Sequence, residues 1–113
     1  MLTYRKHLSE PWFSKVFEGS KIFEGRLNKN DFNNMKINDH IIFYNDNKEF
    51  TVEIISIDNY NCFNDYLIDK TIEKCLPCNY IHSIEDGLNE YYKFYKKEEE
   101  EKYGVICIGM KIF

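Results

Sequence analysis

The stretch His40-Ile-Ile-Phe-Tyr-Asn-Asp-Asn-Lys-Glu-Phe-Thr-Val-Glu-Ile-Ile-Ser-Ile-Asp58 decides the fold. Residues 40–45 and 49–58 are rich in β-branched and aromatic side chains, and the polar residues between them favour a turn, so we predict a β-hairpin. Alternation with polar neighbours places three apolar side chains of the second strand on one face: Phe50, Val52 and Ile54. The apolar phase then moves to Ile55 and Ile57, which predicts a β-bulge near residues 54–55.

Further elements extend outward from this hairpin on both sides. A strand is expected over 21–27, and the apolar run 105–113 predicts a closing strand that is buried on both faces at its start. A short turn of helix is expected at 31–35. The first expected helix is 9–19, with an apolar stripe of Trp12, Phe13, Val16 and Phe17. A second, over 62–67, would turn Phe63, Tyr66 and Leu67 inward. Two more helices are expected over 71–76 and 83–97, and a Ser83–Asp86 capping box opens the last. This order predicts an α+β fold: a small, mostly antiparallel β-barrel with short helices covering its openings.

Length and composition narrow the class of protein. The 113 residues suit a single domain over 1–113, and 43% apolar residues are typical of a globular protein. No apolar run approaches the roughly 20 residues of a membrane span, and residues 1–7 lack the apolar region of a signal peptide, so we expect an intracellular protein with no membrane association. A net charge of −4 excludes a wholly basic nucleic-acid coat but permits a local positive site.

The four cysteines carry a weak metal signal. Cys75 and Cys78 have the CxxC spacing, and His82 follows four residues later. One such pair supplies two of the four ligands of a structural zinc site, and the chain has no second pair. We therefore expect reduced thiols, no metal and no cofactor, and the spacing leaves the role of Cys75 and Cys78 open.

The densest polar group is Lys21, Glu24, Arg26 and Asn28. A lysine and a carboxylate can move protons, and a guanidinium offers a planar fork of donors for a phosphate, carboxylate or base edge. Such a set either lines a ligand cleft or forms a ladder of surface ion pairs. Strict alternation would place Lys21 on the opposite face from Glu24 and Arg26, so a shared cleft requires Lys21 to lie in the turn before the strand. Gly25 between them predicts a bulge or a close backbone approach.

Aromatic residues could complete such a cleft. Trp12 and Tyr95 are candidates to stack on a base, although core packing is the alternative for Trp12. The aromatic patch Tyr91, Tyr92, Phe94 and Tyr95 is interleaved with lysines, and the helical spacing of Tyr91 favours a core position. Of the three histidines, His7 has the best claim to a site because it precedes the helix that leads to Lys21. We expect residues 98–101 to be a solvated acidic run.

The order of these motifs resembles the ASCH domain family. Pro11-Trp-Phe13 and Gly19-Ser-Lys21, which continues into Glu24-Gly-Arg-Leu-Asn28, resemble its opening helix and "GxKxxExR"-like strand. Lys36-Ile-Asn-Asp39 before the hairpin looks like its "KxGD" segment, with Asn38 in place of the usual glycine. Later matches to the family pattern are Cys62-Phe-Asn-Asp-Tyr-Leu67, Pro77, Ser83-Ile-Glu-Asp-Gly87, Phe94-Tyr95 and Tyr103-Gly-Val105.

The resemblance implies a PUA-like β-barrel, related to domains that bind RNA and modified bases. Some small bacterial relatives are acetylcytidine amidohydrolases that use a lysine, a threonine three residues after it and a later glutamate, and another relative is reported as a ribonuclease. Lys21 matches the family lysine and Arg26 the family arginine, whereas Glu24 occupies the place of the threonine. For the later glutamate, the chain offers Glu85 or Glu90.

Three hypotheses follow. The first is a module that binds RNA or a modified nucleotide in a cleft floored by Lys21, Glu24 and Arg26, with Asn28 at the rim and Trp12 and Tyr95 beside it. The second is a small hydrolase of acylated cytidine or RNA, with Lys21 as base and Glu24 as proton shuttle. The third is a protein-interaction module in which the acidic run 98–101 meets a basic partner.

Overall fold

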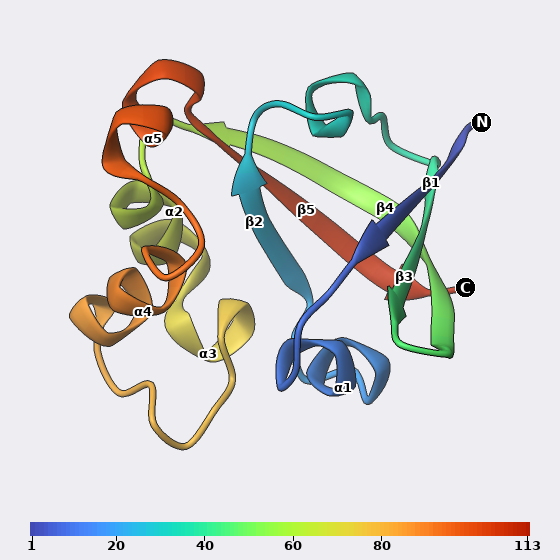
Figure 1. Cartoon of the computed structure of the whole chain (residues 1–113), viewed down its shortest axis with the longest axis horizontal. Helices are drawn as coiled ribbons and strands as arrows, with labels where there is room; N and C mark the ends of the chain where they lie inside the picture. The colour runs from blue at the N-terminus through green and yellow to red at the C-terminus, as the bar shows by residue number, and fades with distance from the viewer.

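A computed structural model describes residues 1–113 as one curled five-stranded sheet with helices around it (Figure 1). The strands are β1 (Thr3–His7), β2 (Phe23–Leu27), β3 (His40–Asn45), β4 (Lys48–Tyr60) and β5 (Val105–Ile112). The helices are α1 (Trp12–Phe17), α2 (Phe63–Lys70), α3 (Ile72–Cys75), α4 (Ile84–Tyr91) and α5 (Lys97–Tyr103), with a 3₁₀ turn at Phe32–Asn34. None of the helices has the length and apolar character needed to span a bilayer.

The sheet has the strand order β1-β3-β4-β5-β2, so β1 and β2 are its two edges. Three of the pairings are antiparallel and one, β1 with β3, is parallel. Figure 1 shows the sheet curling so that β1 and β2 approach each other, with α1 below them and α2 to α5 gathered beside β2. The predicted α+β fold, a mostly antiparallel barrel-like sheet with helices over its openings, is confirmed as a half-barrel.

The hairpin that decides the fold forms as predicted. His40 pairs with Glu53 at one end of β3, and Asn45 pairs with Lys48 at the turn. The predicted bulge is confirmed by a register shift between Ile54 and Ser56 where β4 pairs with β5. The thirteen-residue β4 pairs with β3 through Lys48–Glu53 and with β5 from Val52 to Tyr60, so both partners meet it only just before the bulge.

Strand β1 is absent from the sequence prediction. Its side chains alternate between exposed and half-buried, and its residues include two cations and a histidine, so it has no continuous apolar signal. It forms because β3 presents a free edge, beside which Tyr4 pairs with Ile41 and His7 with Tyr44. Pairing with a distant segment, rather than local preference, therefore fixes this strand.

Three local predictions need correction. The helix predicted over 83–97 ends at Tyr91, and a separate helix α5 begins at Lys97. Phe17 does not share the buried stripe of α1, because it is 61% exposed. The acidic run is not wholly solvated, because Glu100 is buried and accepts a hydrogen bond from the Phe63 amide at 2.7 Å. Its carboxylate thereby satisfies the otherwise unpaired first amide of α2, which Cys62 does not cap.

Gly25 marks a close approach in the middle of β2, and not a bulge. The β2–β5 register is regular, and the ring of Tyr66 from α2 lies directly against the glycine. A Cβ at this position would stand 2.6 Å from Cε2 of Tyr66, closer than two carbon atoms can pack. Glycine therefore sets how closely the helical layer approaches β2.

We expect Gly25→Ala to lower the free energy of unfolding by about 1–3 kcal/mol, because the added methyl group overpacks the Tyr66 ring. The measurement is urea denaturation of the wild type and the variant. In a Tyr66→Leu background, which removes the clashing ring atoms, the same substitution should cost markedly less. Equal costs in both backgrounds would contradict a clash with Tyr66.

Candidate functional site

A cavity of about 240 Å³ opens between β2, the start of α1 and α4. Its floor carries charged side chains, and its walls carry aromatic ones. The lining residues with polar or aromatic side chains are His7, Ser9, Trp12, Lys21, Glu24, Arg26, Glu90, Tyr91, Phe94 and Tyr95, joined by Leu8, Gly25 and Leu76. A concave site with a few convergent polar groups among apolar walls is typical of small-ligand pockets.

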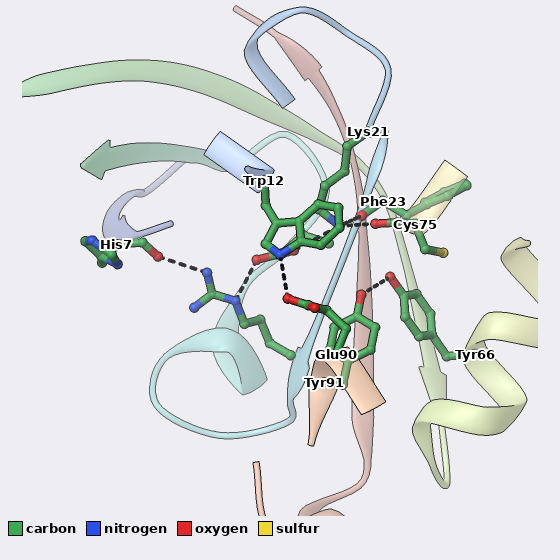
Figure 2. Close-up of polar contacts among 10 residues, drawn as sticks. His7, Trp12, Lys21, Phe23, Tyr66, Cys75, Glu90 and Tyr91 are labelled. Atoms are coloured by element: carbon green, nitrogen blue, oxygen red, sulfur yellow. Dashed lines mark hydrogen bonds and ion pairs between the residues drawn. The ribbon is translucent and has the colours of Figure 1, made fainter. Parts of the chain in front are cut away.

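Lys21 lies in the turn before β2, which begins at Phe23. Its side chain is 1% exposed. The ammonium donates to the Phe23 carbonyl at 2.6 Å and to the carbonyl of Cys75 in α3 (Figure 2), and it lies 3.2 Å from Oε1 of Glu24. Because an ammonium has three N–H donors, these three oxygens use all of them.

Glu24 is the carboxylate at the centre of the floor, and it is 4% exposed. One oxygen faces Lys21, and the other accepts from Nε of Arg26 at 2.7 Å. Burial alone would raise the pKa of Glu24, but the charges and hydrogen bonds of Arg26 and Lys21 outweigh burial and lower it. The floor is therefore an ionised triad with one net positive charge.

Arg26 is the member of the triad that reaches the open pocket, with a side chain that is 19% exposed. Besides Glu24, it donates from Nη2 to the backbone carbonyl of His7 at 2.9 Å (Figure 2). These bonds use two of the five guanidinium N–H donors and leave three for a ligand. Burial opposes its charge, but the Glu24 carboxylate overcomes burial and raises the pKa of Arg26.

A second carboxylate, Glu90 of α4, forms the opposite wall and is buried. It accepts from the indole N–H of Trp12 at 3.2 Å (Figure 2) and pairs with the exposed Lys93 at 2.9 Å. Of the two glutamates that the resemblance offered, Glu90 lines the pocket, whereas Glu85 is exposed and does not. A signal for this choice existed in the sequence, because a buried Trp12 needs an acceptor for its N–H.

Two tyrosines of the aromatic patch line the pocket in different ways. Tyr91 is buried, and its hydroxyl shares a hydrogen bond of 2.9 Å with Tyr66 (Figure 2), which fits the predicted core position. Tyr95 stacks on Phe63 with ring centroids 5.4 Å apart, and its hydroxyl has no protein partner. Burial raises the pKa of Tyr95 to about 12, with Arg26 opposing the rise and Glu24 adding to it, so the hydroxyl is neutral and can donate to a ligand.

The remaining predicted residues are distributed as follows. Trp12, Lys21, Glu24, Arg26 and Tyr95 all line the pocket. Asn28 does not line it, because it lies past the end of β2, where its backbone N–H donates to the Gly104 carbonyl. Of the histidines, only His7 lines the pocket.

The CxxC pair forms neither a disulfide nor part of a metal cluster in the structure. Cys75 is buried and Cys78 half-buried, and both are free thiols. No group of three or more histidine, cysteine or acidic side chains is placed to hold a metal ion. Burial raises the pKa of Cys75, whose contribution to the site is its backbone carbonyl.

Comparisons with known proteins agree with this fold. The chain is similar to the crystal structure of a hypothetical protein, PH0355, with a TM-score of 0.90 and 32% identity over 98% of this chain and 99% of the other. It is also similar to the solution NMR structure of protein PF0455 from Pyrococcus furiosus, with a TM-score of 0.81 and 31% identity over 98% and 97% of the two chains. A search of curated proteins finds no match.

The chain is thus an α+β half-barrel protein with a charged pocket beside its edge strand β2. The model of the ASCH domain matches residues 7–113, so the chain belongs to the ASCH domain family. The ASCH domain from Lactobacillus crispatus has the same fold, with a TM-score of 0.59 and 14% identity over 98% of this chain and 79% of that domain.

We expect Glu24→Gln to lower the free energy of unfolding at pH 7 by about 3–5 kcal/mol, because it leaves the buried Lys21 and the half-buried Arg26 without their counterion. The pKa of Glu24 is lowered in the folded state, so its contribution is present above the pKa of an unfolded glutamate, about 4.3, and is lost as the pH falls through the folded value. The difference between wild type and variant should therefore shrink below pH 4.3.

The measurement is urea denaturation from pH 7 to pH 3. Glu99→Gln, which alters a pair with Lys29 whose side chains are 39% and 28% exposed, is the control and should cost no more than about 1 kcal/mol. A Glu24→Gln variant as stable as the wild type at pH 7 would contradict an ionised buried triad.

Proposed function

We propose that the pocket binds a single base of RNA or of a nucleotide. The observation that carries this proposal is Arg26, whose three unpartnered N–H donors stand at the floor of an aromatic-walled pocket. A guanidinium held on a fixed carboxylate presents its donors in a fixed plane, which suits the edge of a planar ring. Tyr95 supplies aromatic surface in the same pocket, whereas Trp12 packs in the core and borders the pocket.

Size and charge support the same conclusion. The cavity, at about 240 Å³, is smaller than the roughly 300–1,000 Å³ of sites for drug-sized ligands, so it suits one ring system and not a longer ligand. Glu90 adds a second carboxylate to the lining, and its pair with the exposed Lys93 can give way to an exocyclic amine of the base. ASCH domains are thought to bind RNA, and a local positive floor within a chain of net charge −4 would direct the nucleic acid to this place.

The contacts of Lys21 support binding over hydrolysis. A lysine that acts as a base must offer a free electron pair to the substrate, and a donor must offer a free N–H. Lys21 directs all three N–H groups at Phe23, Cys75 and Glu24, and Glu24 has both oxygens occupied by cations. We therefore assign Lys21 to positioning Glu24, and Glu24 to positioning Arg26.

No contact favours the third hypothesis, a protein-interaction module built on the acidic run. Glu100 is buried, and Glu99 pairs with Lys29, which leaves Glu98 and Glu101 as the exposed members of the run. Two carboxylates on one short helix offer a basic partner little more than an ordinary surface does.

We expect Arg26→Ala to weaken RNA binding at least about tenfold, because it removes charge-assisted hydrogen bonds to the base. Trp12 is the only tryptophan and lines the pocket, so its fluorescence reports occupancy directly during titration with short RNAs of each base. Arg5→Ala is the matched control, since Arg5 is the only other arginine and its side chain is 55% exposed on β1.

The Arg5 variant should bind as the wild type does. Circular dichroism and thermal unfolding establish that each variant is folded before titration. Equal affinities of the wild type and a folded Arg26→Ala variant would overturn the proposed function.

A second prediction separates binding from hydrolysis. The wild type should release no product from a panel of N-acylated cytidines and short RNAs, as followed by chromatography over many hours. Turnover that disappears in Lys21→Ala while ligand still quenches Trp12 would instead assign a catalytic role to Lys21. That result would replace the binding module with a hydrolase.

A further inference from the structure

A second, smaller groove adjoins the pocket on the side of β1. Its volume is about 170 Å³, and its lining includes Lys6, Arg26, Lys29, Phe32 and Tyr95. Arg26 and Tyr95 line both hollows, so the guanidinium and the phenol stand at the boundary between them. A ligand whose base occupies the pocket could therefore continue past Arg26 into this groove.

The charge of the groove differs from that of the chain as a whole. Every charged side chain in its lining is a cation: Lys6, Arg26 and Lys29. Two of these cations lie over the ring of Phe32, with Arg26 at 5.0 Å and Lys6 at 5.1 Å from its centroid. In a protein of net charge −4, three cations that converge on one small groove form a local site for an anion.

The groove lysines have carboxylate partners, but these lie outside the lining. Lys6 lies 3.3 Å from Asp31, whose side chain is 60% exposed, and Lys29 lies 2.5 Å from Glu99, whose side chain is 39% exposed. The lysine side chains are 18% and 28% exposed, but both carboxylates keep contact with water, so an arriving anion can displace either of them at a cost of about 1 kcal/mol. Lys6 also donates to the Asn30 carbonyl at 2.7 Å, which fixes its ammonium at the groove.

We propose that this groove binds the phosphate attached to the base in the pocket, so that the ligand is a nucleotide or an RNA strand and not a free nucleoside. This inference rests on the proposed function and specifies its ligand class. Arg26 connects the two subsites: Glu24 holds its Nε, and its free donors lie where base and phosphate meet. Lys6 and Lys29 supply the remaining charge for the phosphate oxygens.

The test compares the four ribonucleosides with their 5′- and 3′-monophosphates and with tetranucleotides, using Trp12 fluorescence at two salt concentrations. We expect at least one monophosphate or tetranucleotide to bind about tenfold or more tightly than its nucleoside, with the advantage falling as salt rises. Lys6→Gln and Lys29→Gln should each reduce this ratio several-fold and leave nucleoside affinity unchanged. Lys48→Gln, at the exposed first residue of β4, makes the same change of charge away from the groove and should leave the ratio intact.

Three outcomes would overturn the inference, and they differ in what they imply for the proposed function. Equal affinity for nucleosides and monophosphates would remove the phosphate subsite while the base pocket stands. A monophosphate advantage that Lys6→Gln, Lys29→Gln and Lys48→Gln lower equally would reduce the groove to a general charge effect. Absence of binding by every ligand, with folded protein, would remove both proposals.

Discussion

The carboxylate of Glu24, which has almost no contact with water, determines how the site is assembled. It receives Lys21 from the turn before β2 and Arg26 from within β2, and each cation then binds a backbone carbonyl elsewhere: Cys75 in α3 and His7 at the end of β1. One buried ion thus connects two edge strands and the helical layer. Buried ionised groups persist only where charges and hydrogen bonds compensate for lost hydration, and this network supplies both.

The position of the pocket follows from incomplete closure of the sheet. The two edge strands, β1 and β2, are not neighbours in the strand order, so no ladder of backbone hydrogen bonds joins them. Arg26 crosses this gap by one bond to His7, and Lys6 crosses it by binding Asn30 and Asp31 beyond β2. Side-chain contacts at an otherwise open edge leave room for two adjoining hollows, each with cationic groups already held in place.

Sequence patterns predicted the parts of the molecule that depend on local preference. The hairpin, its bulge and the inward face of α2 follow from alternation and helical spacing. Contacts between distant segments were not accessible in the same way. Strand β1 depends on the free edge of β3, and the burial of Glu100 depends on an unpaired amide of α2. The polar group Lys21, Glu24 and Arg26 could be identified from the sequence because its members lie close together in the chain. Asn28 was included for the same closeness alone, and it lies past the strand end.

The identity of residue 24 separates this chain from the amidohydrolase pattern that its motifs resemble. That pattern has a threonine three residues after the lysine, and a hydroxyl there neither carries charge nor requires a counterion. A carboxylate in its place binds the ammonium of Lys21 on one oxygen and orients Arg26 on the other. Under the proposed function, this carboxylate therefore makes Lys21 a structural cation and holds the guanidinium of Arg26 in a fixed plane.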